Sequence, residues 1–411
     1  MRYLIYTLLI SCLFTSLTQA QNLSDSLQNL RVDVVYLASD LLEGREPGTQ
    51  GEALAAQYIT YRFETMGLSP FGIDSTWYQP FTFKFHANPH ESEENKDQLS
   101  GKNVLGYLDN DAEYTIVIGG HYDHLGYGTF GSRYVGDPAI HNGADDNASG
   151  IAVMLDLADR LSKASFTNHN YLFLAFSAEE WGLVGSKHFV NHPLMDLEKI
   201  SCMINLDMVG RLNEKKVLAV NGVGTSPAWK PALEELEVAG IQVKMSESGI
   251  GPSDHTSFYL KDIPAIHFFT GQHTDYHKPI DDSQLINYEG MGEVSSLIYT
   301  LLEKLDATDT LDFTPTKDES QSRTAASFKV TLGVMPDYVS EEEGMQIDAV
   351  IEGRPAEKAG IQDGDVVIQI GTYNVTDIYS YMEALSKFEK GNKATVKVKR
   401  GEEELEFEVE F

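Results

Sequence analysis

The feature that most constrains the fold is an alternation of short apolar runs and helix-patterned segments through the middle of the chain. The apolar runs lie at residues 114–119, 171–176, 200–206 and 263–269. Helical spacing of apolar residues is found at 150–162, and a closing helix is predicted at 288–305. Buried strands that alternate with helices are typical of parallel sheets covered on both faces. The sequence therefore predicts an α/β fold with a mostly parallel mixed central sheet flanked by helices.

The region before this sheet is predicted to be mainly helical. Leucine and valine recur at spacings of three and four within residues 23–67, and a second helix is expected at 51–66 after a Glu-Pro-Gly break. Residues 77–85 alternate between apolar and polar side chains, which predicts a strand. The polar and charged segment 86–100 predicts a surface loop or the end of a hairpin.

The first twenty residues have the pattern of a secretory signal peptide. A short positive start is followed by an apolar stretch and a small residue at Ala20, so we predict cleavage there and export to the periplasm or the extracellular space. A membrane anchor is disfavoured because the run is short for a bilayer span. Lipoprotein processing at Cys12 is an alternative, although apolar residues continue past that cysteine. After cleavage Cys202 is the only cysteine, which excludes an internal disulfide, and no later stretch is apolar enough to span a membrane.

Length and charge bound the organisation and the partners. A chain of 411 residues exceeds what one core usually fills, so we expect two domains. The polar segment 311–325 predicts a linker between a larger domain at 21–310 and a smaller one at 326–411. The chain carries 31 Lys and Arg against 62 Asp and Glu, a net charge of −31. This charge argues against nucleic acid or an anionic membrane surface as a partner, because both require a positive face.

Polar clusters follow the apolar runs or precede a helix. They lie at residues 119–124, 143–150, 177–182, 205–208 and 275–279. Taken singly, each has an ordinary interpretation as a surface turn, a helix cap or a solvated charge pair. In open α/β sheets, however, ligands bind beyond the carboxyl ends of the strands, so we expect these clusters to converge. The candidate metal ligands among them are His121, Asp145, Glu180, Asp207 and His277.

The residue types in this set suit zinc. Imidazole nitrogen and carboxylate oxygen are common zinc ligands. Three carboxylates against two Zn²⁺ leave an excess of positive charge, which favours ionisation of a bound water. Asp123 is placed to fix the tautomer of His121. Of the adjacent pair Glu179 and Glu180, one can bind metal while the other acts as general base.

The ordered motifs HYDH, GADDNASG, SAEEWGLVGS, NLDM and DYHKPIDD resemble those of the secreted co-catalytic di-zinc aminopeptidases of the leucyl type, a family related to glutaminyl cyclases and glutamate carboxypeptidases. The resemblance covers residues 25–305 and implies a zinc-peptidase-like fold with two Zn²⁺. It implies that Asp145 bridges both ions and is followed by a cis peptide bond to Asp146. It also implies that His121 and Asp207 bind one ion and that Glu180 and His277 bind the other.

The resemblance also implies roles in hydrolysis of N-terminal residues from peptide substrates. Glu179 is implied as general base and acid, Asp123 as the group that orients His121, and Tyr276 as an oxyanion stabiliser. A carboxypeptidase or dipeptidase of the same fold is the nearest alternative, and a non-catalytic adaptor is a more distant one. The cyclases use a single zinc, whereas here all five ligand positions are filled. The insertion 126–141 is expected to form either a lid over the substrate pocket or a plain surface loop.

The region 326–411 resembles a bacterial PDZ domain, a small β-barrel-like α+β fold. The matching pieces lie at 331–334, 353–361 and 363–367. The resemblance implies that Leu332, Gly333 and Val334 form the loop whose backbone N–H groups bind a peptide C-terminus, with a helix near 379–388 closing the groove. The alternative is a packing module without a free ligand. Strict alternation at 404–411 predicts a final strand with one buried face.

Overall fold

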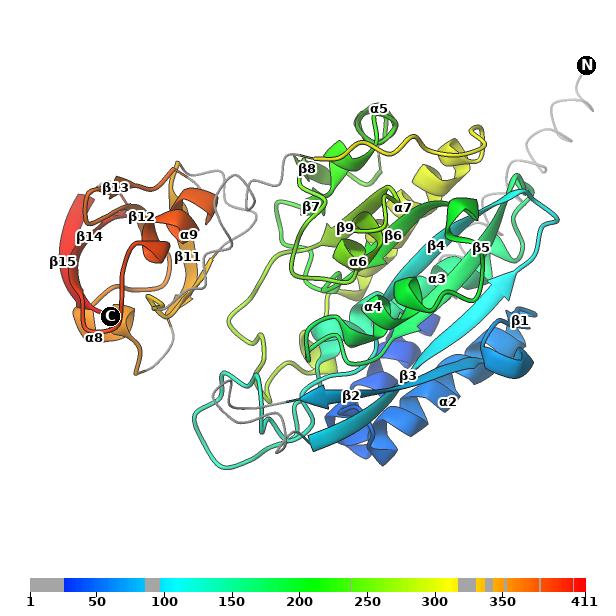
Figure 1. Ribbon diagram of the computed structural model, residues 1–411, viewed down its shortest axis with the longest axis horizontal. Helices are drawn as coiled ribbons and strands as arrows, with labels where there is room; N and C mark the ends of the chain where they lie inside the picture. The colour runs from blue at the N-terminus through cyan, green and yellow to red at the C-terminus, as the bar shows by residue number, and fades with distance from the viewer. Residues whose placement is uncertain are drawn as a thin grey trace, which may run out of the picture.

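The computed structural model describes residues 26–85, 97–236, 238–316, 330–336, 343–350, 353–376, 378–401 and 403–411. The predicted signal peptide and the predicted linker beyond residue 316 lie outside the described residues. Figure 1 shows a larger domain that holds β1 to β9, and a smaller one, in orange and red, that holds β10 to β15. Within the described ranges, no helix combines the length and the apolar character needed to cross a membrane.

The N-terminal region is helical, as predicted, and is followed by a hairpin. Residues 26–37 form a helix. The next elements are η1 (Asp40–Arg45), α2 (Gln50–Thr65), β1 (Ser69–Pro70), η2 (Ile73–Ser75), β2 (Tyr78–Phe85) and β3 (Asp97–Leu108). Thr49 caps α2 by accepting a hydrogen bond from the backbone N–H of Glu52. The expected loop 86–100 is shorter than predicted, because residues 97–100 already pair with β2.

The central region alternates strands and helices. Its strands are β4 (Tyr114–His121), β5 (His169–Phe176), β6 (Ile200–Leu206), β7 (Val217–Asn221), β8 (Gln242–Ser246) and β9 (Ala265–Phe269). Its helices are η4 (Ala144–Ser149), α3 (Gly150–Leu161), α4 (Val184–Asn191), η5 (Leu197–Lys199), η6 (Val223–Thr225), α5 (Trp229–Glu234), α6 (His255–Tyr259), η7 (Ser283–Leu285) and α7 (Tyr288–Leu305).

The nine strands form one mixed sheet in the order β1-β3-β5-β4-β6-β9-β7-β8, with β2 paired to β3. The central strands β5, β4, β6 and β9 run parallel to their neighbours, whereas β3 and β7 join this group in antiparallel orientation. The predicted mixed sheet is therefore confirmed. Because β4, β5, β6 and β9 are parallel and adjacent, their carboxyl ends meet at one edge.

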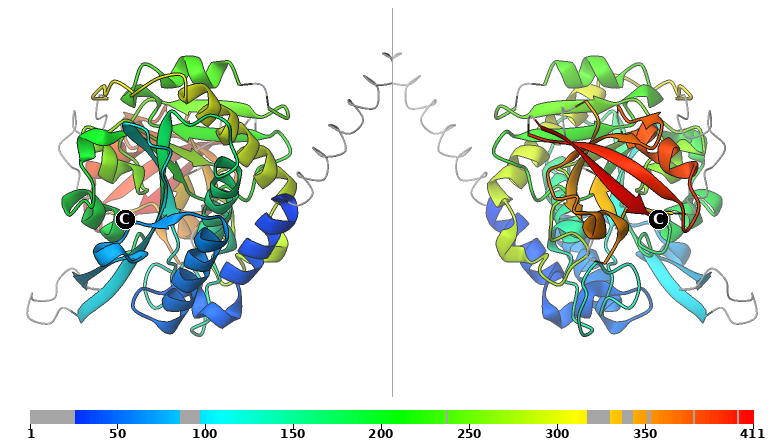
Figure 2. Two further views of the ribbon diagram at one scale, coloured as in Figure 1. Left: turned by 90° about the vertical axis from the view of Figure 1, so that its right-hand side faces the viewer. Right: turned by 90° about the vertical axis from the view of Figure 1, so that its left-hand side faces the viewer.

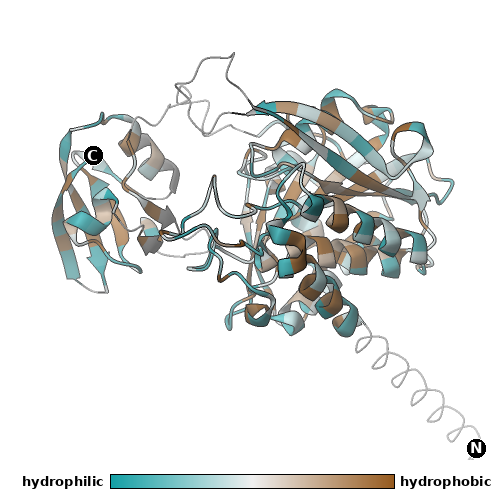
Figure 3. Cartoon of the chain, turned by 90° about the horizontal axis from the view of Figure 1, so that it is seen from below, coloured by the Kyte–Doolittle hydropathy of each residue, from teal (hydrophilic) through white to brown (hydrophobic). Residues whose placement is uncertain are grey.

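Helices cover both faces of this sheet (Figure 2). Side chains of β5 alternate between the two cores: Tyr171 and Phe173 pack with α2, α3 and α7, while Leu172 and Leu174 pack with α4 and α6. The burial of both faces explains why these strands read as unbroken apolar runs. Figure 3 shows brown apolar and teal polar residues alternating along elements that bury only one face.

Residues 311–316, which we expected to begin the linker, pack on the larger domain. Leu311 is buried in the main core. The backbone N–H of Thr314 donates to the carbonyl of Thr225 at 2.8 Å, and the ring of Phe313 lies 5.6 Å from that of Tyr259. The larger domain therefore uses these residues as part of its own structure.

The smaller domain contains β10 (Val334–Pro336), β11 (Met345–Val350), α8 (Pro355–Ala359), β12 (Val366–Ile370), β13 (Tyr373–Asn374), α9 (Ile378–Ser386), β14 (Lys393–Arg400) and β15 (Glu403–Glu410). Its antiparallel sheet has the order β10-β11-β12-β14-β15, with β13 paired to β12. Val409 is buried in its core, and Leu405, Phe407 and Phe411 pack against the same cluster. The predicted one-sided final strand is thus confirmed.

Candidate active site

The polar segments that follow the parallel strands do meet at one edge of the sheet. His121 is the last residue of β4, and Asp207 follows β6 directly. Glu179 and Glu180 follow β5, and His277 lies in the loop after β9. The structure therefore brings together residues that are more than 150 positions apart in sequence, as the convergence of parallel strand ends requires.

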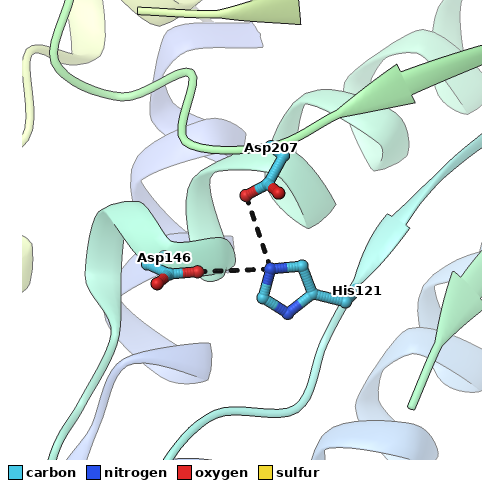
Figure 4. Close-up of side chains that lie close together, drawn as sticks. All are labelled: His121, Asp146 and Asp207. Carbon is cyan, nitrogen blue, oxygen red and sulfur yellow. Dashed lines mark ion pairs between the residues drawn. The ribbon is translucent and has the colours of Figure 1, made fainter. Parts of the chain in front are cut away.

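One side of the cluster is formed by His121, Asp146 and Asp207 (Figure 4). The Nε2 atom of His121 lies 3.2 Å from Oδ1 of Asp146 and 3.4 Å from Oδ1 of Asp207. The second oxygen of Asp207, Oδ2, accepts a hydrogen bond from the Ser253 hydroxyl at 2.6 Å. Ser253 thereby leaves only Oδ1 of Asp207 facing the histidine.

The other side of the cluster is formed by His277, Glu180 and the second oxygen of Asp146. The Nε2 atom of His277 lies 3.1 Å from Oδ2 of Asp146 and 3.1 Å from Oε2 of Glu180. The two oxygens of Asp146 thus face two different histidines, His121 and His277. This is the arrangement required of a carboxylate that bridges two cations.

The structure corrects the expectation for Asp145, because it does not bring that residue to the cluster. Oδ1 of Asp145 accepts from the backbone N–H of Gly210 at 2.6 Å, and Oδ2 lies 3.1 Å from Nε2 of His273. Asp146 occupies the position expected for Asp145. The cis peptide bond is likewise displaced by one residue, since it joins Asp146 and Asn147. Two adjacent aspartates look alike in sequence, and only the course of the backbone separates them.

The expected contact between Asp123 and His121 is made chiefly through the backbone of Asp123. Nδ1 of His121 lies 3.2 Å from the carbonyl oxygen of Asp123 and 3.7 Å from its Oδ1. The carboxylate of Asp123 instead accepts from the backbone N–H of Glu179 at 3.1 Å. Asp123 therefore connects His121 to the segment that carries Glu179.

Burial and neighbouring charges shift the pKa values of the adjacent residues Glu179 and Glu180 in opposite directions. Burial raises the pKa of Glu179 well above its usual value, and the negative charges of Glu180, Asp254 and Asp207 raise it further, although His121 opposes the shift. The opposite holds for Glu180, whose pKa is lowered to about 2 because His277 and His124 outweigh the effect of burial. Neighbouring glutamates that differ in this way suit different roles, one as a proton carrier and one as a permanent anion.

Asp281 holds the backbone that carries the two aspartates. Its Oδ2 accepts the backbone N–H groups of Asp145 and Asp146 at 2.9 and 3.1 Å. Oδ1 lies 3.2 Å from Nη2 of Arg211, which also reaches Asp275 at 3.1 Å. Asp281 belongs to the DYHKPIDD motif, so this motif supplies a support for Asp146 as well as His277.

Arg45 is a buried cation that our sequence interpretation missed. Its guanidinium donates to the carbonyl oxygens of Tyr122 at 2.7 Å, Asn142 at 2.6 Å and Gly143 at 3.0 Å. These carbonyls belong to the loop after β4 and the loop before Asp146. Burial lowers the pKa of Arg45 to about 10, and the negative charges of the site oppose this shift. No periodicity or motif distinguishes this arginine from a surface one in the sequence.

The insertion 126–141 contacts His277 at the site. The carbonyl of Gly131 accepts from Nδ1 of His277 at 2.9 Å, and the backbone N–H of Arg133 donates to the carbonyl of His277 at 2.9 Å.

The ring of Tyr276 stacks on His277 at 3.8 Å, and the guanidinium of Arg133 lies 4.6 Å from the centre of the Tyr276 ring. Burial and the nearby carboxylates Asp146 and Glu180 raise the pKa of Tyr276 well above its usual value. Tyr276 is therefore a neutral hydrogen-bond donor at ordinary pH.

The donor set fits zinc. Ligand atoms that bind one tetrahedral zinc at about 2.0–2.1 Å lie about 3.3 Å from each other. The four separations that involve Nε2 of His121 and Nε2 of His277 lie between 3.1 and 3.4 Å. Oδ1 of Asp207 and Nε2 of His277 are buried, and within the described ranges their close contacts do not have the geometry of hydrogen bonds. Buried polar atoms without partners that converge at this spacing are what a bound cation would satisfy.

Comparison with known proteins identifies the two domains. Residues 103–302 match Peptidase family M28, and residues 330–411 match the PDZ domain. The chain therefore carries a family M28 peptidase domain followed by a PDZ domain. It is 34% identical to aminopeptidase YwaD of Bacillus subtilis over 166 residues, 38% of this chain and 36% of that protein. The matched part is thus about a third of the length of the first curated relatives.

Solved structures show the same fold. The aminopeptidase from Aneurinibacillus sp. strain AM-1 has a TM-score of 0.54 at 18% identity, with 70% of this chain and 95% of that chain covered. BSAP, a zinc aminopeptidase from Bacillus subtilis, has a TM-score of 0.53 at 18% identity, again with 70% and 95% covered. At such low identity the likeness shows the fold alone.

In the smaller domain, the structure places the predicted peptide loop at the start of the edge strand β10. Leu332 is buried, and its carbonyl accepts from the backbone N–H of Ala356 at 2.8 Å. The backbone N–H of Gly333 donates to the Thr331 hydroxyl at 2.9 Å. Val334 begins β10, which pairs only with β11 among the described strands. The second edge of β10 faces away from the sheet.

Proposed function

We propose that the protein is a metal-dependent aminopeptidase that uses two zinc ions. The observation that carries this proposal is Asp146, whose two oxygens face His121 and His277 at 3.2 and 3.1 Å. His121 and Asp207 would hold one ion, and His277 and Glu180 the other, with Asp146 shared. The zinc aminopeptidase fold and the family match support the choice of metal.

When bound, the ions supply polarisation of the scissile carbonyl and ionisation of a water molecule near neutral pH. The protein itself moves the proton. We assign Glu179 as the base that takes the proton from water and returns it to the leaving amine, because its raised pKa suits a group that must be both base and acid. Asp123 positions Glu179 through the backbone N–H contact. The neutral hydroxyl of Tyr276 is proposed to stabilise the developing oxyanion.

The preference for a free N-terminus rests on charge. His121 groups with Glu179 and Glu180 in one cluster and with Asp146 and Asp207 in another, so we expect a substrate α-ammonium group to be attracted to this concentration of carboxylates. A carboxypeptidase or a dipeptidase would need a cation that recognises the substrate carboxylate. Cleavage of N-acetylated and C-amidated copies of one peptide separates these cases, because an aminopeptidase rejects the first and accepts the second.

The test of this proposal combines metal analysis with one substitution. The purified protein should bind two zinc ions per chain, release N-terminal residues from peptides, and lose this activity with a chelator until zinc is restored. Glu179→Gln should keep both ions and lose about 10²–10⁴-fold in kcat, since it removes only the proton carrier. The exposed Glu198 in η5 provides the control, Glu198→Gln, which should behave as wild type. Full activity in zinc-free protein would overturn the proposal.

For the smaller domain we propose capture of a peptide C-terminus beside Leu332, Gly333 and Val334. Among the described strands β10 pairs only with β11, and an extended peptide can add to a strand edge that is unpaired in this way. Export through the predicted signal peptide remains a prediction. Peptide capture is tested by titrating the protein with a free-acid peptide and with its C-amidated copy, of which only the first should bind. Export is tested by N-terminal sequencing of the mature protein.

A further inference from the structure

His124 is a buried histidine at the site that neither the motif resemblance nor the comparisons assign. It follows His121 by three residues, at the end of the HYDH motif, and none of its surface is exposed. Its Nδ1 atom lies 2.8 Å from Oε1 of Glu180 and 3.9 Å from Oδ2 of Asp146. Its Nε2 atom has no hydrogen-bond partner in the described part of the chain. The ring therefore directs its one short polar contact at Glu180.

The two oxygens of Glu180 are divided between two histidines. Oε1 faces Nδ1 of His124 at 2.8 Å, whereas Oε2 faces Nε2 of His277 at 3.1 Å. A carboxylate can present either oxygen to a cation, or both. With Oε1 engaged by His124, only Oε2 remains directed toward His277 and Asp146, where the proposed second ion binds. Metal-binding carboxylates are commonly held in this way by a hydrogen-bond donor behind them.

The position of His124 is itself fixed. Its backbone N–H donates to the carbonyl of Arg45 at 3.3 Å, and Gly143 packs against its ring so closely that a Cβ there would lie 2.5 Å from the His124 ring. Arg45 in turn donates to the carbonyls of Tyr122 and Gly143. The ring of His124 thus lies between the loop after β4 and the loop before Asp146. A side chain held from both sides can impose an orientation on Glu180.

We propose that His124 is a positioning residue for the second metal position, donating its Nδ1–H to Oε1 of Glu180 so that Glu180 binds the ion through Oε2 alone. This inference rests on the proposed di-zinc function and deepens it. It distinguishes the two positions chemically. The carboxylate Asp207 is held by a serine hydroxyl, whereas Glu180 is held by an imidazole.

The test measures zinc affinity of the full chain by competition with a chromophoric chelator, which needs no activity. His124→Ala should weaken one of the two zinc affinities by about 10–100-fold and change the other less than about threefold. His124→Asn should restore most of the loss, because its amide N–H occupies the place of Nδ1–H while being a poor zinc ligand. The exposed His192 supplies the control, His192→Ala, which should match wild type.

The outcomes separate this inference from the proposed function. If wild type itself binds fewer than two zinc ions, the di-zinc proposal fails first. If wild type binds two and His124→Ala leaves both affinities unchanged, Glu180 does not depend on His124 and the inference is overturned. If His124→Asn binds zinc as weakly as His124→Ala while circular dichroism shows both variants folded, an amide donor cannot replace the imidazole. This result also overturns the proposed donor role of His124.

Discussion

At the scale of single residues, the site depends on which oxygen atom faces which nitrogen atom. Four of the five expected ligands, His121, Glu180, Asp207 and His277, lie in the cluster, whereas Asp145 is replaced by its neighbour. Sequence order located the segments because parallel strands deliver them to one edge. It did not resolve Asp145 from Asp146, because that choice depends on the backbone N–H groups held by Asp281.

The burial of Asp254 predicts that the stability of the zinc-free protein depends on pH. Burial raises the pKa of Asp254 from 3.8 to about 7, with Asp207 and Asp123 raising it further and His121 opposing. Between about pH 4 and 7, Asp254 is therefore protonated in the folded zinc-free protein and ionised in the unfolded chain. Its contribution to the free energy of unfolding consequently declines as the pH rises through this range. Asp254→Asn should remove this decline and stabilise the zinc-free protein at pH 8 by on the order of a few kcal/mol.

The measurement is urea unfolding of zinc-free wild type and Asp254→Asn at several pH values. A curve for the variant that runs parallel to wild type from pH 4 to 8 would refute the assignment of this pH dependence to Asp254. The exposed Asp262, three residues beyond α6, offers the matched substitution Asp262→Asn, for which no change in slope is expected.

At the scale of elements, long apolar runs and strict alternation were predictive, and shorter or mixed segments were not. The apolar runs became β4, β5, β6 and β9, and the helix expected at 51–66 corresponds to α2 within one residue at each end. The strands β7 and β8 were missed. Both have five residues, as β9 does, but β9 lies within the longer apolar run 263–269, whereas β8 is an edge strand with partly exposed side chains. Short runs of this kind carry little periodicity.

The hydrogen bonds of Arg45 connect the loops that carry the site residues, and a substitution tests their contribution. Arg45→Met should lower the free energy of unfolding by about 3 kcal/mol or more, because the buried carbonyls of Tyr122, Asn142 and Gly143 lose their donor. Zinc binding should weaken as well, since both ligand-bearing loops depend on these contacts. Denaturant unfolding and chelator competition measure the two effects. The exposed Arg31 provides Arg31→Met as control, and equal stability of the two variants would contradict the account.

At the scale of the whole molecule, the two domains have separate cores, and the boundary lies later than composition suggests. Leu311 is buried in the core of the larger domain, 6% exposed, although its segment is polar enough to predict a linker. A polar segment can therefore pack on a domain when one buried apolar residue and a few backbone hydrogen bonds stabilise the contact.

The net charge of −31 is only in small part explained by the carboxylates of the site.

Leu311→Ala should therefore destabilise the larger domain by about 2–3 kcal/mol through the loss of buried methyl groups. The exposed Leu285 supplies the comparison, because Leu285→Ala removes the same atoms from a side chain that is 47% exposed and should cost far less. Thermal unfolding of the full chain, followed by tryptophan fluorescence, measures the difference. Equal midpoints for the two variants would show that residues 311–316 do not contribute to the larger domain.

The measurement that most directly tests the central claim is the zinc content of three proteins: wild type, Asp145→Asn and Asp146→Asn. If Asp146 is the shared ligand, wild type and Asp145→Asn retain two ions per chain, while Asp146→Asn retains at most one after dialysis against micromolar free zinc. Asp145→Asn alters the contact with His273 and should lower stability, but it should still bind two zinc ions per chain. Loss of zinc from Asp145→Asn together with full retention in Asp146→Asn would contradict the account.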